Sequence, residues 1–138
     1  MKKNNKGFSL VELIIVIAIM AILAGALAPA LIKYINKSRM STDISNADTI
    51  RSAVQTAMSN EEAMAPLAAT STTNSVSAWK ACGQFGTELS SILGSSAVKG
   101  KYYSKNSEFT ILIDVPNNKV EVYGKNASGA DVKLSPSK

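Results

Sequence analysis

The residue whose type and position most suggest chemistry is Glu12, a carboxylate at the front of a long apolar segment. Residues 13–32 are twenty consecutive positions without a charged or strongly polar side chain. An ionisable side chain in such a segment costs free energy, so it indicates a function by default. Phe8 lies four residues earlier and follows Gly7.

The usual catalytic and metal-binding patterns are absent from the sequence. There is no histidine, which removes the commonest general base and the commonest metal ligand. No Ser/His/Asp, Cys/His, CxxC, HExxH, P-loop or GxGxxG pattern occurs. The one cysteine, Cys82, cannot form a disulfide within the chain. We therefore predict a protein that is not an enzyme and has no catalytic residue, cofactor or metal site.

The positive charge of the chain is concentrated at its start. The formal net charge is +5, and Lys2, Lys3 and Lys6 lie within the first seven positions. The rest carries twelve basic and ten acidic residues, and the basic ones are scattered. Because no basic run remains, specific nucleic-acid binding is not predicted. A length of 138 residues suits one domain with a modest core.

A basic start before a long apolar run is a membrane-targeting signal. A secretory signal peptide would be cut after Ala26 or Ala28, but its apolar region is usually shorter and has no carboxylate. A single-pass anchor fits better, because twenty helical residues span about 30 Å. The preceding lysines favour a cytoplasmic N-terminus. This anchor explains everything except Gly7, Phe8 and Glu12.

The sequence KGFSLVEL at residues 6–13 resembles the type IV prepilin signature. In that family a short basic leader ends in glycine, and a membrane-embedded peptidase cuts after it and methylates the new N-terminal residue, usually phenylalanine. A glutamate stands fifth in the mature chain. Here the leader would be residues 1–7, the mature chain would start at Phe8, and Glu12 would be fifth. The resemblance covers about the first 35 residues.

The resemblance implies a structural subunit of a type IV pilus or pilus-like filament. Gly7 and Phe8 would be the cleavage site, Phe8 the methylated residue, and Glu12 and Pro29 assembly residues. The implied partners are a prepilin peptidase/methyltransferase, other pilins in the filament, an assembly ATPase, an inner-membrane platform protein, and membrane lipid before assembly. The precursor is expected in the cell membrane with its N-terminus in the cytoplasm, and the mature protein in a pilus at the cell surface.

Two alternatives to a pilus subunit remain at this stage. One is a competence or type II secretion pseudopilin, which would share the same N-terminal motif. The other is a membrane-anchored extracellular binding domain that forms no filament. The N-terminus of the mature protein distinguishes the anchored domain from a processed pilin.

Pro29 would be the twenty-second residue of the mature chain, where pilins commonly have a proline. Proline removes a helical hydrogen bond and clashes with the preceding turn, which membrane helices tolerate. Together with Gly25, it interrupts the apolar helix. The resemblance suggests residues 21–29 as a flexible part of the packed helix.

The helical pattern continues beyond the apolar segment. Five apolar residues recur at spacings of three and four, which indicates an amphipathic helix: Ile44, Ala47, Ile50, Val54 and Met58. Four polar residues, Asp43, Asp48, Arg51 and Gln55, are placed between or opposite them. No proline or glycine occurs in residues 34–65. We predict one helix over residues 8–60, roughly 78 Å long.

The middle of the chain is predicted as a loop and a second helix. Residues 65–77 are rich in Ala, Thr and Ser and contain Pro66, which indicates a loop. Apolar residues then recur at helical spacing over residues 77–93, although Gly83 and Gly86 weaken this helix. Cys82 lies on its apolar stripe and is predicted to be a buried free thiol.

The last third has the alternation of β-strands. Residues 109–115 predict a half-buried strand, and Pro116-Asn117-Asn118 a turn. Residues 119–123 predict a second strand with Val120 and Val122 inward. Residues 126–129 form another turn signal, 130–134 a closing strand, and 100–104 a possible edge strand. The result is an antiparallel meander of three or four strands.

The predicted fold class is α+β. A long N-terminal α-helix, half transmembrane and half amphipathic, packs on a small C-terminal antiparallel β-sheet with a second short helix. The predicted domains are a leader at residues 1–7, a transmembrane and filament-core helix at 8–32, and an extracellular globular domain at 33–138.

Overall fold

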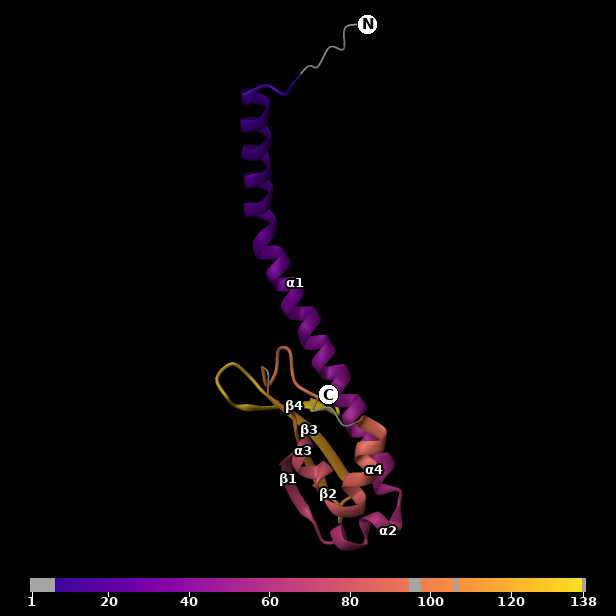
Figure 1. The fold of residues 1–138 in the computed structure, drawn as a ribbon. Coiled ribbons are helices and arrows are strands. Elements are labelled where there is room, and N and C mark those ends of the chain that lie inside the picture. Colours follow the sequence, from indigo (N-terminus) through magenta and orange to yellow (C-terminus); the bar gives the residue numbers. More distant parts are fainter. Residues whose placement is uncertain (1–6, 95–97, 106, 138) are drawn as a thin grey trace, which may run out of the picture. The chain divides into compact units, whose positions relative to one another are not determined.

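The longest element of the chain is α1, Leu10–Met58, which is drawn in indigo and purple in Figure 1. The computed structural model describes residues 7–94, 98–105 and 107–137. The 49 residues of α1 confirm the helix predicted over residues 8–60. The chain divides into two units, Met1–Lys37 and Ser38–Lys138, so α1 contributes to both.

The first unit consists of the apolar half of α1 and the residues before it. Every described side chain from residue 7 to residue 37 is exposed. Gly25 and Pro29 lie inside α1 without ending the helix. Within the described residues, α1 is the one helix long and apolar enough to cross a membrane, judged by length and composition. An exposed apolar helix needs either lipid or other protein around it.

The second unit is built on a four-stranded antiparallel sheet. Its strands are β1 (Ser71–Ser75), β2 (Thr110–Asp114), β3 (Lys119–Lys125) and β4 (Asp131–Ser135). They lie in the order β1-β2-β3-β4, which confirms the predicted meander. Ile111 and Ile113 on one face of β2, and Phe109 directly before the strand, are completely buried as predicted. The fold class is α+β.

The core of the second unit lies between the sheet, the later part of α1 and two short helices. α1 contributes Ala47, Ile50 and Val54, and the sheet contributes Val120 and Val122. The largest buried side chains, Trp79 and Phe85, make an edge-to-face pair with ring centroids 5.9 Å apart. Trp79 also donates its indole N–H to the backbone carbonyl of Ile111 at 3.0 Å. This bond ties the helical layer to the sheet.

The predicted second helix is two helices, α3 (Val76–Lys80) and α4 (Gly83–Leu93). The chain turns between them at Gly83, whose φ of 51° favours glycine. A Cβ on Gly86 would overlap the carbonyl oxygen of Lys80, so this glycine lets the two helices approach closely. Cys82 is a free cysteine that packs against the core but is only half-buried, so its predicted burial is partial.

The predicted loop over residues 65–77 was wrong. The segment holds a short 3₁₀ helix (Ala65–Leu67) preceded by the single-turn helix α2 (Glu61–Met64), and then the strand β1. β1 has low strand propensity and forms because it pairs with β2 from Ser71 opposite Asp114 to Ser75 opposite Thr110. It takes the edge position that was predicted for residues 100–104. Lys99 and Gly100 form only isolated bridges, to Glu108 and Lys105.

Candidate functional site

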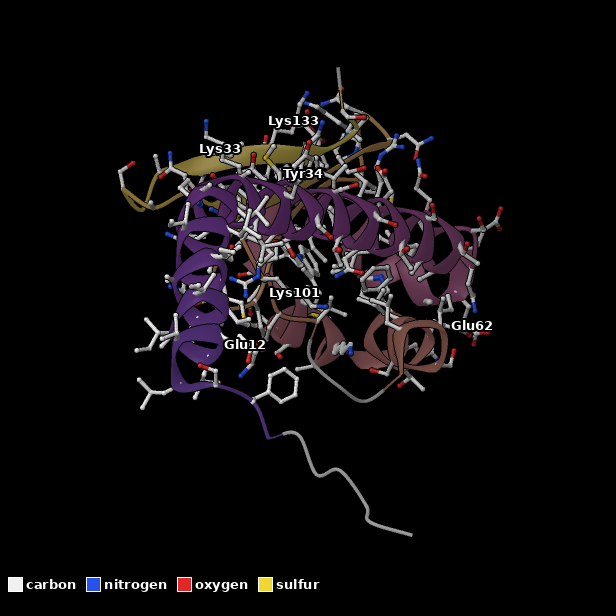
Figure 2. The ribbon with its side chains drawn as sticks, turned by 90° about the horizontal axis from the view of Figure 1, so that it is seen from above. Glu12, Lys33, Tyr34, Glu62, Lys101 and Lys133 are labelled. Atoms are coloured by element: carbon white, nitrogen blue, oxygen red, sulfur yellow. The ribbon has the colours of Figure 1, made fainter. Side chains whose placement is uncertain are left out.

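The predicted assembly residue Glu12 lies in the first turn of α1 (Figure 2). Its carboxylate accepts a hydrogen bond from the backbone N–H of Ser9 at 2.7 Å. The Ser9 hydroxyl oxygen in turn accepts one from the backbone N–H of Val11 at 3.3 Å. The carbonyl of Ser9 accepts the first helical bond, from Leu13 at 3.2 Å. Ser9 and Glu12 therefore form a reciprocal capping box at the start of α1.

The capping box explains why the helix begins where it does. The first N–H groups of any helix lack partners within the helix, and in an apolar environment an unpaired N–H is costly. Ser9 and Glu12 satisfy two of these groups, and a carboxylate is also favoured by the helix dipole at this end. Sequence reasoning missed Ser9, although the spacing S-x-x-E directly before an apolar run is a known helix-start signal.

The other predicted site residues lie apart from this box. Gly7 and Phe8 precede α1, and Phe8 is 93% exposed. No atom of the described part of the chain lies within 4 Å of the position where a Cβ would stand on Gly7. Pro29 is inside α1, about 25 Å along the helix from Glu12 at the standard rise per residue. The structure thus brings Ser9 to Glu12 but does not bring Pro29 to them.

Glu12 is the one acidic residue of the first unit, and the helix surface around it is apolar. After Glu12 the next charged side chain along α1 is Lys33, followed by the aromatic Tyr34 (Figure 2). The apolar side chains between these positions are about half exposed or more, for example Ile15 at 52% and Leu27 at 64%. Such a surface offers apolar contact along its whole length. Within the apolar half of α1, before Lys33, Glu12 is the one charged group, so it can distinguish one axial position of a neighbouring helix from another.

A second polar site lies inside the globular unit, around Asp43. This side chain was predicted on the polar side of the helix, but it is completely buried. Its carboxylate accepts backbone N–H bonds from Lys101 at 2.8 Å, Tyr102 at 2.7 Å and Tyr103 at 2.8 Å. A Cβ on Gly100 would overlap the carbonyl of Tyr103, so the segment can curl around the carboxylate only with glycine there. Asp43 therefore anchors residues 100–103 to α1.

The position of Asp43 had a signal in the sequence. Asp43 stands four residues before Ala47 and seven before Ile50, so it continues the buried stripe of α1. A polar residue on such a stripe is expected to have a specific partner. Its partners, three backbone N–H groups 58 to 60 residues away, cannot be read from sequence spacing.

Two further carboxylates are held by hydrogen bonds at the sheet. Glu108 accepts from the hydroxyl of Ser77 at 2.5 Å and from its backbone N–H at 2.9 Å, which lowers the pKa of Glu108. Glu121 accepts from the hydroxyl of Tyr123 at 2.7 Å, which lowers the pKa of Glu121 and raises that of Tyr123 to about 12. Glu121 also pairs with Lys119 and Lys133. These are structural contacts of the globular unit. In the part of the chain that the structure describes, no three His, Cys, Asp or Glu side chains are grouped to hold a metal ion.

Comparison with known proteins identifies relatives of both the N-terminal segment and the whole chain. Residues 2–28 match the family model of the prokaryotic N-terminal methylation motif. A type IV major fimbrial protein FimA of Dichelobacter nodosus is 33% identical over 131 residues, covering 94% of this chain and 73% of that protein. A second FimA of this species is 31% identical over 131 residues, which again cover 94% of this chain and 73% of that protein. A third is 45% identical over 51 residues, which cover 37% of this chain and 32% of that protein. No solved structure gives a significant match.

The chain combines an exposed apolar helix, which begins with a capped glutamate, with an α+β globular unit, and its sequence matches fimbrial proteins. The chain belongs to the type IV pilin family. It is a structural subunit of a type IV pilus, which assembles with other pilins.

Proposed function

We propose that the chain is made as a membrane precursor, cut between Gly7 and Phe8, methylated on the Phe8 amine, and assembled through residues 8–32. Residues 33–138 would form the extracellular globular domain. The observation that carries the proposal is the position of Glu12, one carboxylate in the first turn of a helix whose apolar half has exposed side chains. Among the residues that the structure describes, nothing lies within 4 Å of the Cβ position of Gly7, which is consistent with access of a peptidase to the backbone there.

The apolar half of α1 serves in two environments. In the precursor it lies in lipid, with the lysines of the leader on the cytoplasmic side. In the filament it lies against the same segment of other copies. Burial away from water is worth about 25 cal/mol per Å² of apolar surface, but lipid already supplies it. Transfer from membrane to filament therefore gains little by itself, which supports an assembly ATPase and a membrane platform protein as partners.

Glu12 sets the axial position of an incoming subunit in this proposal. Its carboxylate uses one acceptor position for the Ser9 N–H, and a carboxylate has about four such positions. The methylated ammonium of Phe8 from an adjacent copy would occupy another. An opposite charge in an apolar surrounding interacts more strongly than in water, so one register is preferred over others. Such a pair contributes specificity more than net stability.

The relatives suggest where the subunit stands in the filament. Those FimA proteins are named major fimbrial proteins. We therefore assign this chain to the body of a pilus at the cell surface, after a stage in the cell membrane. A prepilin peptidase/methyltransferase is the partner that would act on Gly7 and Phe8.

Mass spectrometry of protein sheared from the cell surface tests the proposal. The expected mature chain starts at Phe8 and carries one methyl group on its amine. Gly7→Val provides the matched variant, because its side chain would obstruct the peptidase while the apolar helix is unchanged. This variant should accumulate as full-length precursor in the membrane fraction. A wild-type chain that starts at Met1, or after Ala26 or Ala28, would contradict the proposal.

A further inference from the structure

The sheet of the globular unit has one unprotected edge, the outer side of β1. β1 pairs with β2 on its inner side, and across the described ranges 7–94, 98–105 and 107–137 no segment pairs with its outer side. Figure 1 shows β1 at the margin of the sheet. The edge consists of Ser, Thr and Asn and contains no charge, no proline and no bulge.

The opposite edge of the sheet is protected in the usual ways. β4 carries Asp131 and Lys133 and is followed by Pro136. The pairing of β3 with β4 also has a register shift between Val122 and Tyr123. Charges, prolines and bulges on an edge strand prevent pairing with another chain. β1 lacks all three, so the two edges of the same sheet differ in their capacity to accept a further strand.

The hydrogen-bonding groups that β1 points outward can be identified. The ladder with β2 continues at Val115, whose N–H donates to the carbonyl of Thr70, and at Val76, whose N–H donates to that of Phe109. Bonded pairs alternate along an antiparallel ladder, so the even-numbered residues face β2. The backbone groups of Ser71, Thr73 and Ser75 therefore point outward. Ser71 and Thr73 are both exposed.

We propose that β1 is a contact strand between copies of this chain in different filaments, joined antiparallel edge to edge. In the register centred on Thr72, Ser71 of each copy lies opposite Thr73 of the other. The four outward groups of Ser71 and Thr73 are then bonded, because each Ser71–Thr73 pair exchanges two hydrogen bonds. Ser75, the N-cap residue of α3, lies beyond this pairing. The strands carry no charge and so do not repel, and cross-strand Ser and Thr pairs are favourable.

The symmetry of this contact explains why it joins filaments rather than subunits within one filament. An antiparallel pair of identical strands is related by a two-fold axis, whereas a filament grows by repeated head-to-tail contacts. In this proposal β1 lies on the filament surface, so that two filaments side by side would present one β1 edge per subunit. A contact too weak to hold two monomers is then repeated many times, and the combined attachment is strong. The inference rests on the membership of the chain in the pilin family.

Cysteine cross-linking of intact filaments tests the pairing. Filaments of Ser71→Cys and of Thr73→Cys, each with Cys82→Ser, are sheared, mixed and oxidised. Opposite residues in a bonded pair have Cα atoms about 5.5 Å apart, within disulfide range. Covalent dimers are expected in the mixture and not in either sample alone. Ala127→Cys, exposed in the β3–β4 turn, is the matched control and should not cross-link. A mixture without dimers, or dimers equally abundant in the separate samples, would overturn the pairing.

A proline scan provides a second measurement that does not depend on oxidation. Thr73→Pro removes an outward N–H, so filament yield should be unchanged while bundles seen by electron microscopy and low-speed sedimentation decrease severalfold. Thr73→Lys should also reduce bundling at unchanged filament yield, because a positive charge on each edge strand repels the other. Asn74→Pro removes an N–H that faces β2 and should reduce the yield of filaments themselves. Wild-type filaments that stay single, or Thr73→Pro and Thr73→Lys filaments that bundle normally, would show that β1 is not the contact. A cross-link between the Thr73→Cys variant and a different protein would also show that β1 is not a contact between copies of this chain.

Discussion

The carboxylate of Asp43 accepts the backbone N–H of Tyr103 at 2.8 Å, across 60 residues of sequence. The hydroxyl of Tyr103 lies 3.1 Å from the sulfur of Met40, one turn earlier on α1. Two positions of α1 are thus connected to the same short segment. The path of residues 100–103 depends on the helix that starts the globular unit, rather than on the sheet alone.

The first prediction concerns Asp43. Asp43→Ala would leave three backbone N–H groups without their buried acceptor, so the free energy of unfolding of residues 34–138 should fall by about 3 kcal/mol. Asp48→Ala is the control, because exposed Asp48 accepts only the hydroxyl of Ser135 and its loss should cost about 1 kcal/mol. Urea denaturation measures both. Equal losses would contradict the role of Asp43 as the anchor.

The second prediction concerns residues 34–138 as an isolated fragment. Removal of the exposed apolar helix leaves a unit with its own core, so the fragment should be a folded, soluble monomer. Circular dichroism and analytical ultracentrifugation are the measurements. An unfolded fragment, or one that forms tight oligomers at micromolar concentration, would show that the core depends on the apolar half of α1.

The third prediction concerns acid stability. The hydroxyl and N–H of Ser77 hold the pKa of Glu108 below its usual value of 4.5, with smaller contributions from Lys99 and Lys80. A lowered pKa stabilises the fold above about pH 4.5, and this contribution is lost as pH falls through the lower folded-state value. It amounts to less than about 1 kcal/mol, because solvent screens a half-exposed carboxylate.

Glu108→Gln isolates this effect. The wild-type fragment should melt at a higher temperature than the variant at pH 7, and the difference should shrink below about pH 4.5. Glu62→Gln, at an exposed position of α2, serves as the comparison. A difference between wild type and Glu108→Gln that stays constant from pH 7 to pH 3 would contradict the assigned cause.

Several elements could be predicted from sequence because their signals are local. In α1 apolar residues recur every three or four positions, and in β2 and β3 they alternate with mostly polar ones. Both patterns follow directly from which face of the element is buried. β1 could not be predicted, because Ser71 to Ser75 form a strand only through pairing with β2, about forty residues later. The break at Gly83 and the burial of Asp43 also depend on distant partners. Ser9 is different, since its capping signal was present in the sequence.

The fourth prediction separates two roles of Glu12. In Glu12→Gln the amide oxygen can still accept the Ser9 N–H, so the capping box is retained while the charge is lost. In Glu12→Leu both are lost. Neither change should impair membrane insertion, because each removes a negative charge, and a charge at the centre of a membrane helix opposes insertion by about 2.5–3.5 kcal/mol. Cleavage after Gly7 should remain largely intact in both.

The most direct test is the ratio of sheared surface filament to membrane-fraction protein for wild type, Glu12→Gln and Glu12→Leu, with Glu62→Gln on exposed α2 as control. We expect both Glu12 variants to lose at least about tenfold in this ratio, a factor that corresponds to about 1.4 kcal/mol, while Glu62→Gln matches wild type. A wild-type ratio for Glu12→Gln together with a loss for Glu12→Leu would mean that Glu12 acts only as a helix cap. Normal filaments from Glu12→Leu would contradict any role of this carboxylate in assembly.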